Sequence, residues 1–408
     1  MLSEAYTKII EKRIDKAISS LEEALDEKYR VAIVSDCDPD GLCSMKMLVG
    51  TMRKYGFNYT KEPSQNSYGI VGKLQPQNKQ RLSDKERLHL MNLKPDLIFS
   101  LDLPLQGEYL NGLADIVQRR DSQLISVDHH QTKIPRYTFK KENFLNIVSN
   151  EFSFSTSALT YNLCESLGGQ KYNYLWAAVG LCGDKVDHIG TNVTICTKIL
   201  NNYAGYIRTI KEVIELVGHS RKSYLPQLSD AILNAPTPKS FILQQSLGAE
   251  EVMKVYEELA EIKMQCVIEI LKATKDKDVV EKNLVLEKIN SPDNIGTPII
   301  NEVSTIYPDM NFMLYQHLPS ADESGGTLTK IYFRRSNADL LDNPDVSMGR
   351  IARSAARRIR GKIVGGDKKP VAYAVIPTDQ FAVFNDRAQE EFEKIKDVRK
   401  KHLEKDKN

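Results

Sequence analysis

The sequence predicts an α/β protein with a parallel sheet in its N-terminal part, a helical connector, and a smaller α/β domain, with a cleft between the two α/β parts. Apolar runs of strand length alternate with helical patterns up to about residue 190, which is typical of stacked βαβ units. Long helical patterns then dominate, and strand-like runs return near the C-terminus. We expect the boundaries to give the ranges 1–194, 195–280, 281–390 and a charged tail, 391–408.

The individual elements follow in chain order. Apolar residues at helical spacing predict a helix over 4–27, which leads into a strand at Arg30–Ser35. Two further apolar runs, Leu97–Leu101 and Leu124–Val127, have the length and composition of buried parallel strands. The run Ala177–Gly180, in contrast, is expected to be a buried helix end. The hydroxyl-rich segment Ser153–Ser157 opens a helix through Leu163, where it can cap the helix and leave N–H groups facing an anion.

The remaining elements belong to the connector and the C-terminal part. The patterns predict helices at Tyr203–Val217, Glu250–Thr274, 295–307 and 346–360, strands at Asn283–Ile289, Met310–Leu318, Leu328–Arg335 and Val371–Pro377, and a charged helix or frayed end at Gln389–Asn408. Because Tyr332 and Phe333 alternate along one of these strands, one of them could stack on a base, but core packing is the better interpretation.

Composition limits the classes of function. The chain has 408 residues and a formal net charge of +2, so nucleic-acid binding requires a local basic patch rather than global attraction. Six cysteines without a CxxC pair indicate a reducing cytoplasm. The chain carries no signal peptide and no apolar stretch of membrane-spanning length, so we expect a cytoplasmic protein without membrane contact.

Acidic clusters end the apolar runs. They are Asp36-Cys37-Asp38-Pro39-Asp40-Gly41, Asp102, Asp128-His129-His130 and Gly183-Asp184. In an open α/β sheet the carboxyl ends of the strands share one crevice, so these side chains should meet there. Their repulsion is relieved by bound cations or by protonation. Oxygen-rich donors with one or two imidazoles suit manganese or magnesium better than zinc, which predicts a two-metal phosphoesterase.

The order and spacing of the four clusters resemble the motifs of the DHH phosphoesterase superfamily, and within it the RecJ-like exonucleases, especially the archaeal ones. The resemblance runs from about residue 30 to 190, which makes the N-terminal range a DHH catalytic domain and the range 281–390 a DHH-associated substrate-binding domain. It implies two Mn²⁺ ions, with Mg²⁺ as the alternative. Asp36 and Asp38 would hold one ion, and Asp102 would bridge the two. The second ion would be held by the remaining metal ligands, Asp40, His129 and Asp184.

The same resemblance gives His130 and Asp128 catalytic roles. His130 would lie beside the scissile phosphate as a contact or proton donor, and Asp128 would support the histidines. Each motif alone also has a structural explanation, since an aspartate after a strand commonly caps a helix. The segment Leu103-Pro104 departs from the small residue and glycine common in relatives. Because all the expected ligand and catalytic side chains are retained, we favour an active enzyme over a decayed site.

The C-terminal part resembles the substrate-binding domain less closely. Arg334-Arg335-Ser336 matches a phosphate-contacting segment, and Gly365-Gly366 stand where the family has a Gly-Gly-His motif. Asp367 replaces the expected histidine and Tyr373 an expected glycine. Between these segments lies an arginine row that would track a nucleic-acid backbone, or else form a solvated helix face: Arg350, Arg353, Arg357 and Arg360.

These features predict a single-strand-specific exonuclease for DNA or RNA, acting in DNA replication or repair. One alternative is a phosphodiesterase for short oligonucleotides or cyclic dinucleotides. Another is a replisome scaffold that binds the GINS complex with little or no nuclease activity. A pyrophosphatase is disfavoured, because those relatives carry a histidine two residues before the first aspartate, where this chain has Val34. The sequence indicates neither the polarity of cleavage nor the oligomeric state.

Overall fold

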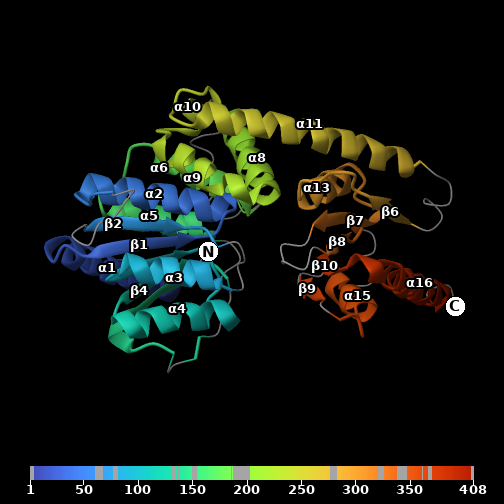
Figure 1. Ribbon diagram of the computed structural model, residues 1–408, viewed down its shortest axis with the longest axis horizontal. Coiled ribbons are helices and arrows are strands. Elements are labelled where there is room, and N and C mark those ends of the chain that lie inside the picture. The colour runs from blue at the N-terminus through green and yellow to red at the C-terminus, as the bar shows by residue number, and fades with distance from the viewer. Residues whose placement is uncertain are drawn as a thin grey trace. The chain divides into compact units, whose positions relative to one another are not determined.

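The computed structural model describes two compact units, Met1–Tyr256 and Glu257–Asn408. The predicted α/β class is confirmed, because each unit contains a five-stranded sheet with helices packed against it (Figure 1). The four ranges expected from the sequence remain a prediction. The described residues are 4–59, 68–76, 81–130, 134–135, 138–148, 154–184, 186, 203–275, 283–319, 326–337, 347–360, 362–365 and 370–405.

The first unit is built on a parallel sheet with the strand order β2-β1-β3-β4-β5. The central strands β1 and β3 are buried on both faces, which explains why they appear in the sequence as continuous apolar runs rather than alternating ones. The predicted strand at Arg30–Ser35 is confirmed as β1. The sheet contains β1 (Arg30–Ser35), β2 (Gly69–Leu74), β3 (Leu97–Leu101), β4 (Gln123–Asp128) and β5 (Phe144–Val148).

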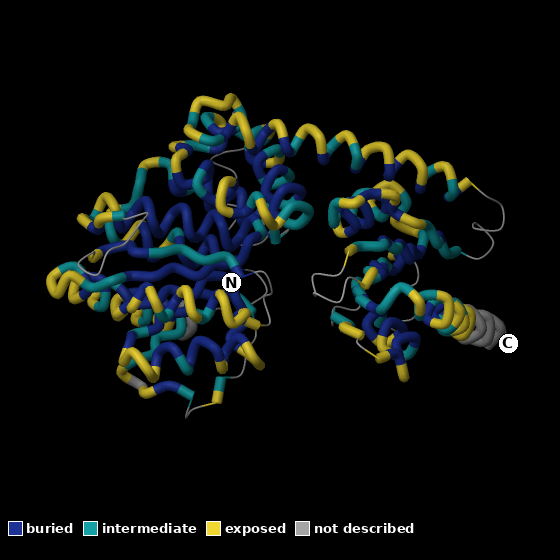
Figure 2. Tube along the Cα trace, viewed as in Figure 1, coloured by how far each residue is buried: buried dark blue, intermediate teal, exposed yellow. Residues whose placement is uncertain are grey.

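Helices cover both faces of this sheet. Figure 1 shows α2 (Pro39–Tyr55) and α5 (Thr156–Ser166) on one face and α3 (Asp84–Leu93) and α4 (Gly107–Arg120) on the other. The apolar core under α3 and α4 is dark blue in Figure 2 and includes Leu90, Ile98 and Leu113. α1 (Glu4–Asp26) packs against α5 and β5. The buried helix end predicted at 177–180 is confirmed, because these residues belong to α6 (Asn173–Gly183).

Among the described residues that follow α6, four more helices precede the second unit's sheet. They are α8 (Ala204–Ser220), α9 (Leu225–Asn234), α10 (Pro238–Ile242) and α11 (Ala249–Ala273), which confirms the predicted helices at 203–217 and 250–274 to within a few residues. α8 packs against α6. Its Gly218 lies close to the segment between β1 and α2, since a Cβ on Gly218 would be 3.0 Å from the carbonyl oxygen of Cys37. Short 3₁₀ turns occur at Lys141–Asn143, Lys222–Tyr224 and Thr378–Gln380.

The second unit has a mixed sheet with the strand order β6-β7-β8-β10-β9, in which only the β6–β7 pair is parallel. One face packs on α13 (Gly296–Ile306), and the other packs on α15 (Met348–Ala355) and α16 (Phe381–Lys405). All four predicted strands are present within one or two residues of their expected ends. The strands are β6 (Leu284–Lys288), β7 (Asn311–Pro319), β8 (Thr327–Arg334), β9 (Ile363–Gly365) and β10 (Val371–Pro377).

One helix is shorter than the sequence predicts. The expected helix over 346–360 ends at Ala355, and Arg358 has a positive φ of 68°. Side chains bind the carbonyl oxygens that follow the helix, since Lys362 Nζ donates to Ala356 O over 2.6 Å. The expectation that Arg357 and Arg360 continue the helical row of Arg350 and Arg353 is therefore wrong. Within the described residues, no helix is both long and apolar enough to cross a membrane.

Candidate metal centre

Three aspartates of the centre are brought together by the register of the parallel sheet. Asp36 follows β1, Asp102 follows β3, and Asp128 is the last residue of β4. The main-chain N–H of Asp36 donates to Leu101 O over 3.1 Å, and that of Asp102 donates to Val127 O over 3.0 Å. Because the ladder continues to the strand ends, the three carboxylates lie at one edge of the sheet. Asp102 takes a left-handed φ of 58°, which an aspartate tolerates.

The start of α2 supplies two more carboxylates. Asp38 is the N-cap of this helix, and its Oδ1 accepts the N–H of Gly41 over 3.1 Å. Pro39 at the first helical position lacks an N–H that would otherwise need a partner. A Cβ at Gly41 would lie 2.6 Å from Asp36 O, so only glycine fits this turn. The Asp-x-Asp-x-Asp-Gly spacing thus combines a strand end, a helix cap and a first helical turn.

The first turn of α5 holds Asp40 and Asp102. The main-chain N–H groups of Thr156 and Ser157 donate to the two carboxylate oxygens of Asp40 over 2.7 and 2.8 Å, and Ser157 Oγ donates to the same carboxylate. Thr156 Oγ1 donates to Asp102 Oδ1 over 3.0 Å. Ser155 caps the helix as expected. The helix N-terminus therefore faces an anion, but here that anion is a carboxylate of the protein itself.

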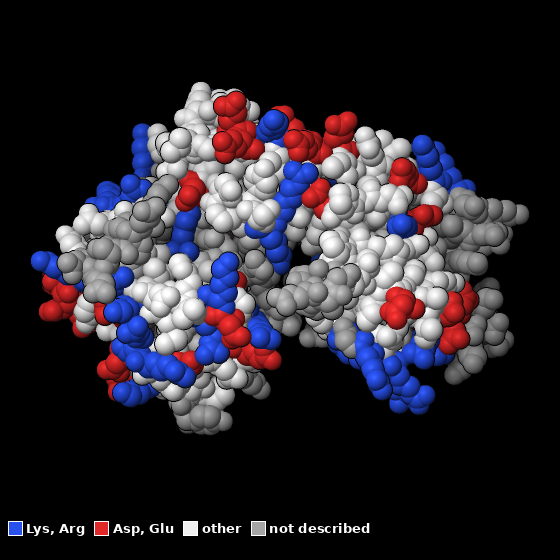
Figure 3. All heavy atoms as spheres, viewed as in Figure 1, with Lys and Arg blue, Asp and Glu red and all other residues white. Residues whose placement is uncertain are grey.

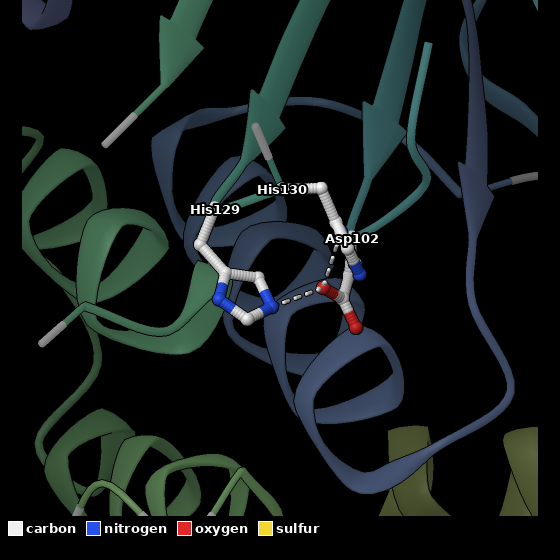
Figure 4. Close-up of side chains that lie close together, drawn as sticks. All are labelled: Asp102, His129 and His130. Carbon is white, nitrogen blue, oxygen red and sulfur yellow. Dashed lines mark ion pairs between the residues drawn. The ribbon is translucent and has the colours of Figure 1, made fainter. Parts of the chain in front are cut away.

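Both histidines extend toward Asp102 (Figure 4). His129 Nε2 lies 3.4 Å from Asp102 Oδ1 and 3.2 Å from Asp184 Oδ2, a residue just beyond α6. His130 Nδ1 lies 2.7 Å from Asp128 Oδ1 and 3.9 Å from Asp102 Oδ1. Asp128 Oδ1 also accepts the main-chain N–H groups of both histidines. Asp128 thus fixes the turn that positions the two imidazoles.

Ligand atoms converge in three overlapping groups, each with its donor atoms within 4.8 Å of one another. The groups are Asp36–Asp38–Asp102, Asp40–His129–Asp184 and Asp102–His129–His130. The first two have the composition expected for the two ion sites, and Asp102 belongs to two of the three groups. Carboxylate oxygens with one or two imidazoles are a donor set that fits Mn²⁺ or Mg²⁺. The assignment of individual ligands to individual ions remains a prediction.

The buried carboxylates of this centre repel one another, and a bound cation would relieve that repulsion. Burial, together with the carboxylates of Asp38, Asp40, Asp184 and Asp36, raises the pKa of Asp102 well above its ordinary value. Burial lowers the pKa of His129, and His130 adds to this effect, although Asp40 and other carboxylates oppose it. A neutral imidazole is the form that binds a metal. Cations would neutralise the buried carboxylates, so the residues present fit a pair of divalent ions.

Sequence reasoning missed three residues that shape the centre. Thr156 and Ser157 were recognised only as part of a helix cap, whereas they bind Asp40 and Asp102. Gly180 packs against them so closely that a Cβ would lie 1.8 Å from Ser157 Oγ and 2.9 Å from Asp40 Oδ1. A run of small and hydroxyl residues was the only available signal, and such runs are common at helix starts.

The predicted substrate contacts lie in the second unit. Arg334 at the end of β8 is partly buried, while Arg335 and Ser336 are buried. The main-chain N–H of Ser336 donates to Asn311 Oδ1 over 3.0 Å. Gly365 ends β9, beside the ring of Tyr373. Gly366 and Asp367 lie outside the described residues. The role of these residues in substrate binding stays a prediction.

The predicted arginine row is exposed. All of its side chains are exposed, as is the neighbouring Arg358; the row consists of Arg350 and Arg353 on α15 and Arg357 and Arg360 beyond its end. Figure 3 shows basic side chains gathered around this part of the second unit. The local basic patch that a chain of nearly zero net charge requires for nucleic-acid binding is therefore present on the surface.

Comparison with known protein families identifies the class of the first unit. Residues 30–183 match the family model described as "DHH family, N-terminal domain". This segment contains every strand of the first sheet and all residues of the metal centre except Asp184, which follows it directly. This segment is therefore similar to the N-terminal domain of the DHH family, and the fold of the chain is similar to that of RecJ. A search of curated protein sequences gave no match.

The RecJ-like fold rests on comparison with solved structures. RecJ from Thermus thermophilus in complex with Mn²⁺ aligns with a TM-score of 0.63 and 16% identity, over 94% of this chain and 55% of that chain. A manganese-bound exonuclease RecJ aligns with a TM-score of 0.58 and 16% identity, over 93% and 94%. The DHH domain of a member of a family of ribosomal proteins gives 0.66 and 12%, over 94% and 91%. This chain therefore spans about half the length of the Thermus protein.

Proposed function

We propose that this protein is a divalent-metal-dependent phosphodiesterase, and specifically a RecJ-like exonuclease that acts on single-stranded DNA or RNA in replication or repair. The observation that carries the proposal is the convergence of five carboxylates and His129 at the carboxyl edge of the first sheet. A purely structural role does not account for such a cluster, because buried carboxylates without cations destabilise the folded chain. The DHH family match and the manganese-bound RecJ neighbours support the same interpretation.

In this proposal the ligands would be shared between two cations. Asp36, Asp38 and Asp102 would hold one cation, and Asp40, His129 and Asp184 would hold the other together with Asp102. When bound, Mn²⁺ or Mg²⁺ supplies Lewis acidity to water and to the phosphate oxygens. Thr156 and Ser157 keep the Asp40 and Asp102 carboxylates in place before any ion arrives, so little reorganisation is needed on binding.

His130 is the residue placed to handle a proton. Its Nδ1 pairs with Asp128 Oδ1 at 2.7 Å, which directs Nε2 away from that carboxylate. Its side chain is 38% exposed, whereas that of His129 is 21% exposed. An oriented and accessible imidazole beside a metal centre can contact a phosphate oxygen or protonate a leaving oxygen. Asp128 is the residue that positions it.

The surface arginines of the second unit support a polyanionic substrate. Arg350, Arg353 and Arg357 would contact phosphates along a strand, a mode of binding that depends on salt and not on sequence. Short oligonucleotides, cyclic dinucleotides and a scaffold role with the GINS complex remain the alternatives. A substrate series separates them.

The test uses the purified chain with 5′- and 3′-labelled single-stranded DNA and RNA, the matching duplexes, and linear and cyclic dinucleotides. Each substrate is incubated with Mn²⁺, Mg²⁺ or EDTA. We expect metal-dependent release of mononucleotides from the single strands, and its loss in Asp102→Asn and His130→Gln. His89→Gln, which changes an exposed histidine on α3, is the matched control and should retain activity.

The outcomes discriminate between the functions. Turnover confined to dinucleotides would favour the short-substrate phosphodiesterase. No turnover of any substrate by folded protein with either metal would overturn the enzymatic proposal. Co-purification with GINS proteins that survives Asp102→Asn would then support the scaffold.

A further inference from the structure

The sheet of the second unit has one face that α15 and α16 cover. Its other face packs on α13 at β7 and β8, and carries aromatic and basic side chains on β8 and β10. Ile331, Phe333, Ala372 and Ala374 belong to the core under α15 and α16. The alternate residues of β8, β9 and β10 therefore point to the opposite side. That side carries two cations and two tyrosines in adjacent register, with Tyr373 opposite Tyr332 and Gly365, and Val371 opposite Arg334.

The two tyrosines differ in their surroundings. Tyr332 is 3% exposed, donates its hydroxyl to Asn294 Oδ1 over 2.7 Å, and lies against Gly296 of α13. It is a packed residue, as the sequence predicts. Tyr373 is only partly buried, and its ring lies over Gly365, where a Cβ would be 2.4 Å from Cε1 and Cζ. Because the neighbour is glycine, the ring can lie against the backbone of β9.

Positive charge and apolar surface flank the Tyr373 ring. Lys330 Nζ lies 5.9 Å from the centroid of this ring and 5.0 Å from that of Tyr332. Arg334 lies two residues beyond Tyr332 on β8, opposite Val371, and is partly buried. Ile363 on β9 lies opposite Val375, on the same face of the sheet as Tyr373, and is 54% exposed. The strands β7, β8, β9 and β10 contain no aspartate or glutamate, so no carboxylate of these strands opposes an anion here.

We infer that Tyr373, with Lys330 and Arg334, forms a stacking site for one unpaired base of a single-stranded nucleic acid. A partly exposed aromatic ring offers a π-face to any base, and flanking cations neutralise the phosphates on either side of it. In a duplex the base faces are already stacked, so the site selects single strands. The inference rests on the proposed function for the choice of ligand. The resemblance predicts a glycine at position 373, so the stacking ring is a feature of this chain.

The test measures binding without turnover, by fluorescence anisotropy of a labelled oligothymidylate in EDTA with the full-length chain. We compare Tyr373→Phe, which retains a flat ring, with Tyr373→Leu, which still covers Gly365 but has no π-face. Tyr68→Leu, at a tyrosine of the first unit that is 42% exposed, is the matched control. We expect Tyr373→Leu to weaken binding about tenfold, whereas Tyr373→Phe and Tyr68→Leu bind like the native chain. Melting curves verify that each variant is folded.

Three further measurements make the interpretation specific. An oligonucleotide with abasic sites should bind the native chain and Tyr373→Leu equally, because it has no base to stack. Lys330→Ala should reduce the salt dependence of binding, since it removes one phosphate partner. A duplex competitor should displace the single strand poorly.

Native-like affinity of folded Tyr373→Leu would overturn the inference and leave Tyr373 as a cover for the β9 edge. Absence of binding by the native chain would overturn it as well. The nuclease assay run on the same proteins separates the two proposals. Metal-dependent cleavage with unchanged binding in Tyr373→Leu refutes only the stacking site. Ring-dependent binding without any cleavage refutes only the nuclease.

Discussion

The main-chain N–H of Thr156 donates a hydrogen bond to Oδ2 of Asp40 over 2.7 Å, although the two residues are 116 positions apart in the chain. This contact links the first turn of α5 to the first turn of α2. The partial positive charge of a helix N-terminus stabilises the buried carboxylate. The metal centre is therefore organised by helix geometry as well as by strand ends.

The hydroxyl of Thr156 should matter for metal binding. Thr156→Val keeps the shape and the main-chain N–H but removes the bond to Asp102 Oδ1. We expect the affinity for Mn²⁺, measured by isothermal titration calorimetry, to fall about tenfold, as is common when a partner of a metal ligand is lost. Thr160→Val is the control on the same helix, since the buried Oγ1 of Thr160 has no hydrogen-bond partner among the described residues. Equal affinities in both variants would contradict the positioning role.

Metal should stabilise the fold by mass action. At about 100 times the dissociation constant, a ligand that binds only the folded state adds about 2.7 kcal/mol to the free energy of unfolding. We expect Mn²⁺ to raise the melting temperature of the native chain by several degrees relative to EDTA, and to have little effect on Asp102→Asn. If millimolar Mn²⁺ left the melting temperature of the native protein unchanged, this result would count against a metal centre.

The metal-free protein should lose stability as the pH rises. The pKa of Asp102 is raised in the folded state, so the folded chain holds this proton more tightly than the unfolded chain does. The stabilising contribution is complete below the unfolded value, about pH 4, and is lost as the pH rises through the folded value. In EDTA, Asp102→Asn should therefore become more stable than the native chain as the pH increases. Melting curves between pH 4 and 8 measure this difference, and a constant difference would refute it.

Gly180 should tolerate no side chain. In Gly180→Ala the new methyl group would meet Ser157 Oγ and the Asp40 carboxylate, so we expect a loss of about 1–3 kcal/mol in stability and weaker Mn²⁺ binding. Gly112→Ala on α4 is the matched control, because its nearest neighbour would be 3.5 Å away. This control should gain about 0.5–1 kcal/mol from the better helix former. Urea titrations measure the free energy of unfolding of both variants, and a Gly180→Ala variant as stable as the native chain would contradict the prediction.

The buried Lys46 gives a second pH effect. Burial lowers its pKa to about 8, while Nζ donates to Leu233 O over 2.8 Å. The unfolded chain binds this proton more tightly, so native stability from this group rises between pH 8 and about 10.5, by about 3 kcal/mol. Lys46→Met should therefore be more stable than the native chain at pH 7, by about 2 kcal/mol after the lost hydrogen bond is subtracted.

The advantage of Lys46→Met should shrink as the pH rises from about 8 past 10.5, because the native amine is then neutral in the folded state and becomes neutral in the unfolded state as well. Chemical unfolding at about pH 7, 8 and 10 measures the trend. A variant less stable than the native chain at every pH would show that the lysine contributes more by its contacts than burial costs.

Much of the fold was predictable because its local signals agree. β1 and β3 are largely apolar runs, and the four strands predicted in the second unit lie within one or two residues of their expected ends. The buried helix end expected at 177–180 is also present, as part of α6. The end of α15 at Ala355 was missed because its arginines continue the helical spacing, whereas tertiary contacts from Lys362 and Arg387 stabilise the turn that follows.

The sequence by itself determined which side chains could form the metal centre, because the position of each acidic cluster at a strand or helix end is a local property of the chain. Only the tertiary structure decided that α5 delivers N–H groups to Asp40, that Gly180 leaves room for Ser157, and that the ring of Tyr373 lies over Gly365. These relationships join residues that are distant in the chain. They depend on how helices and strands pack, and no local pattern of residues encodes that.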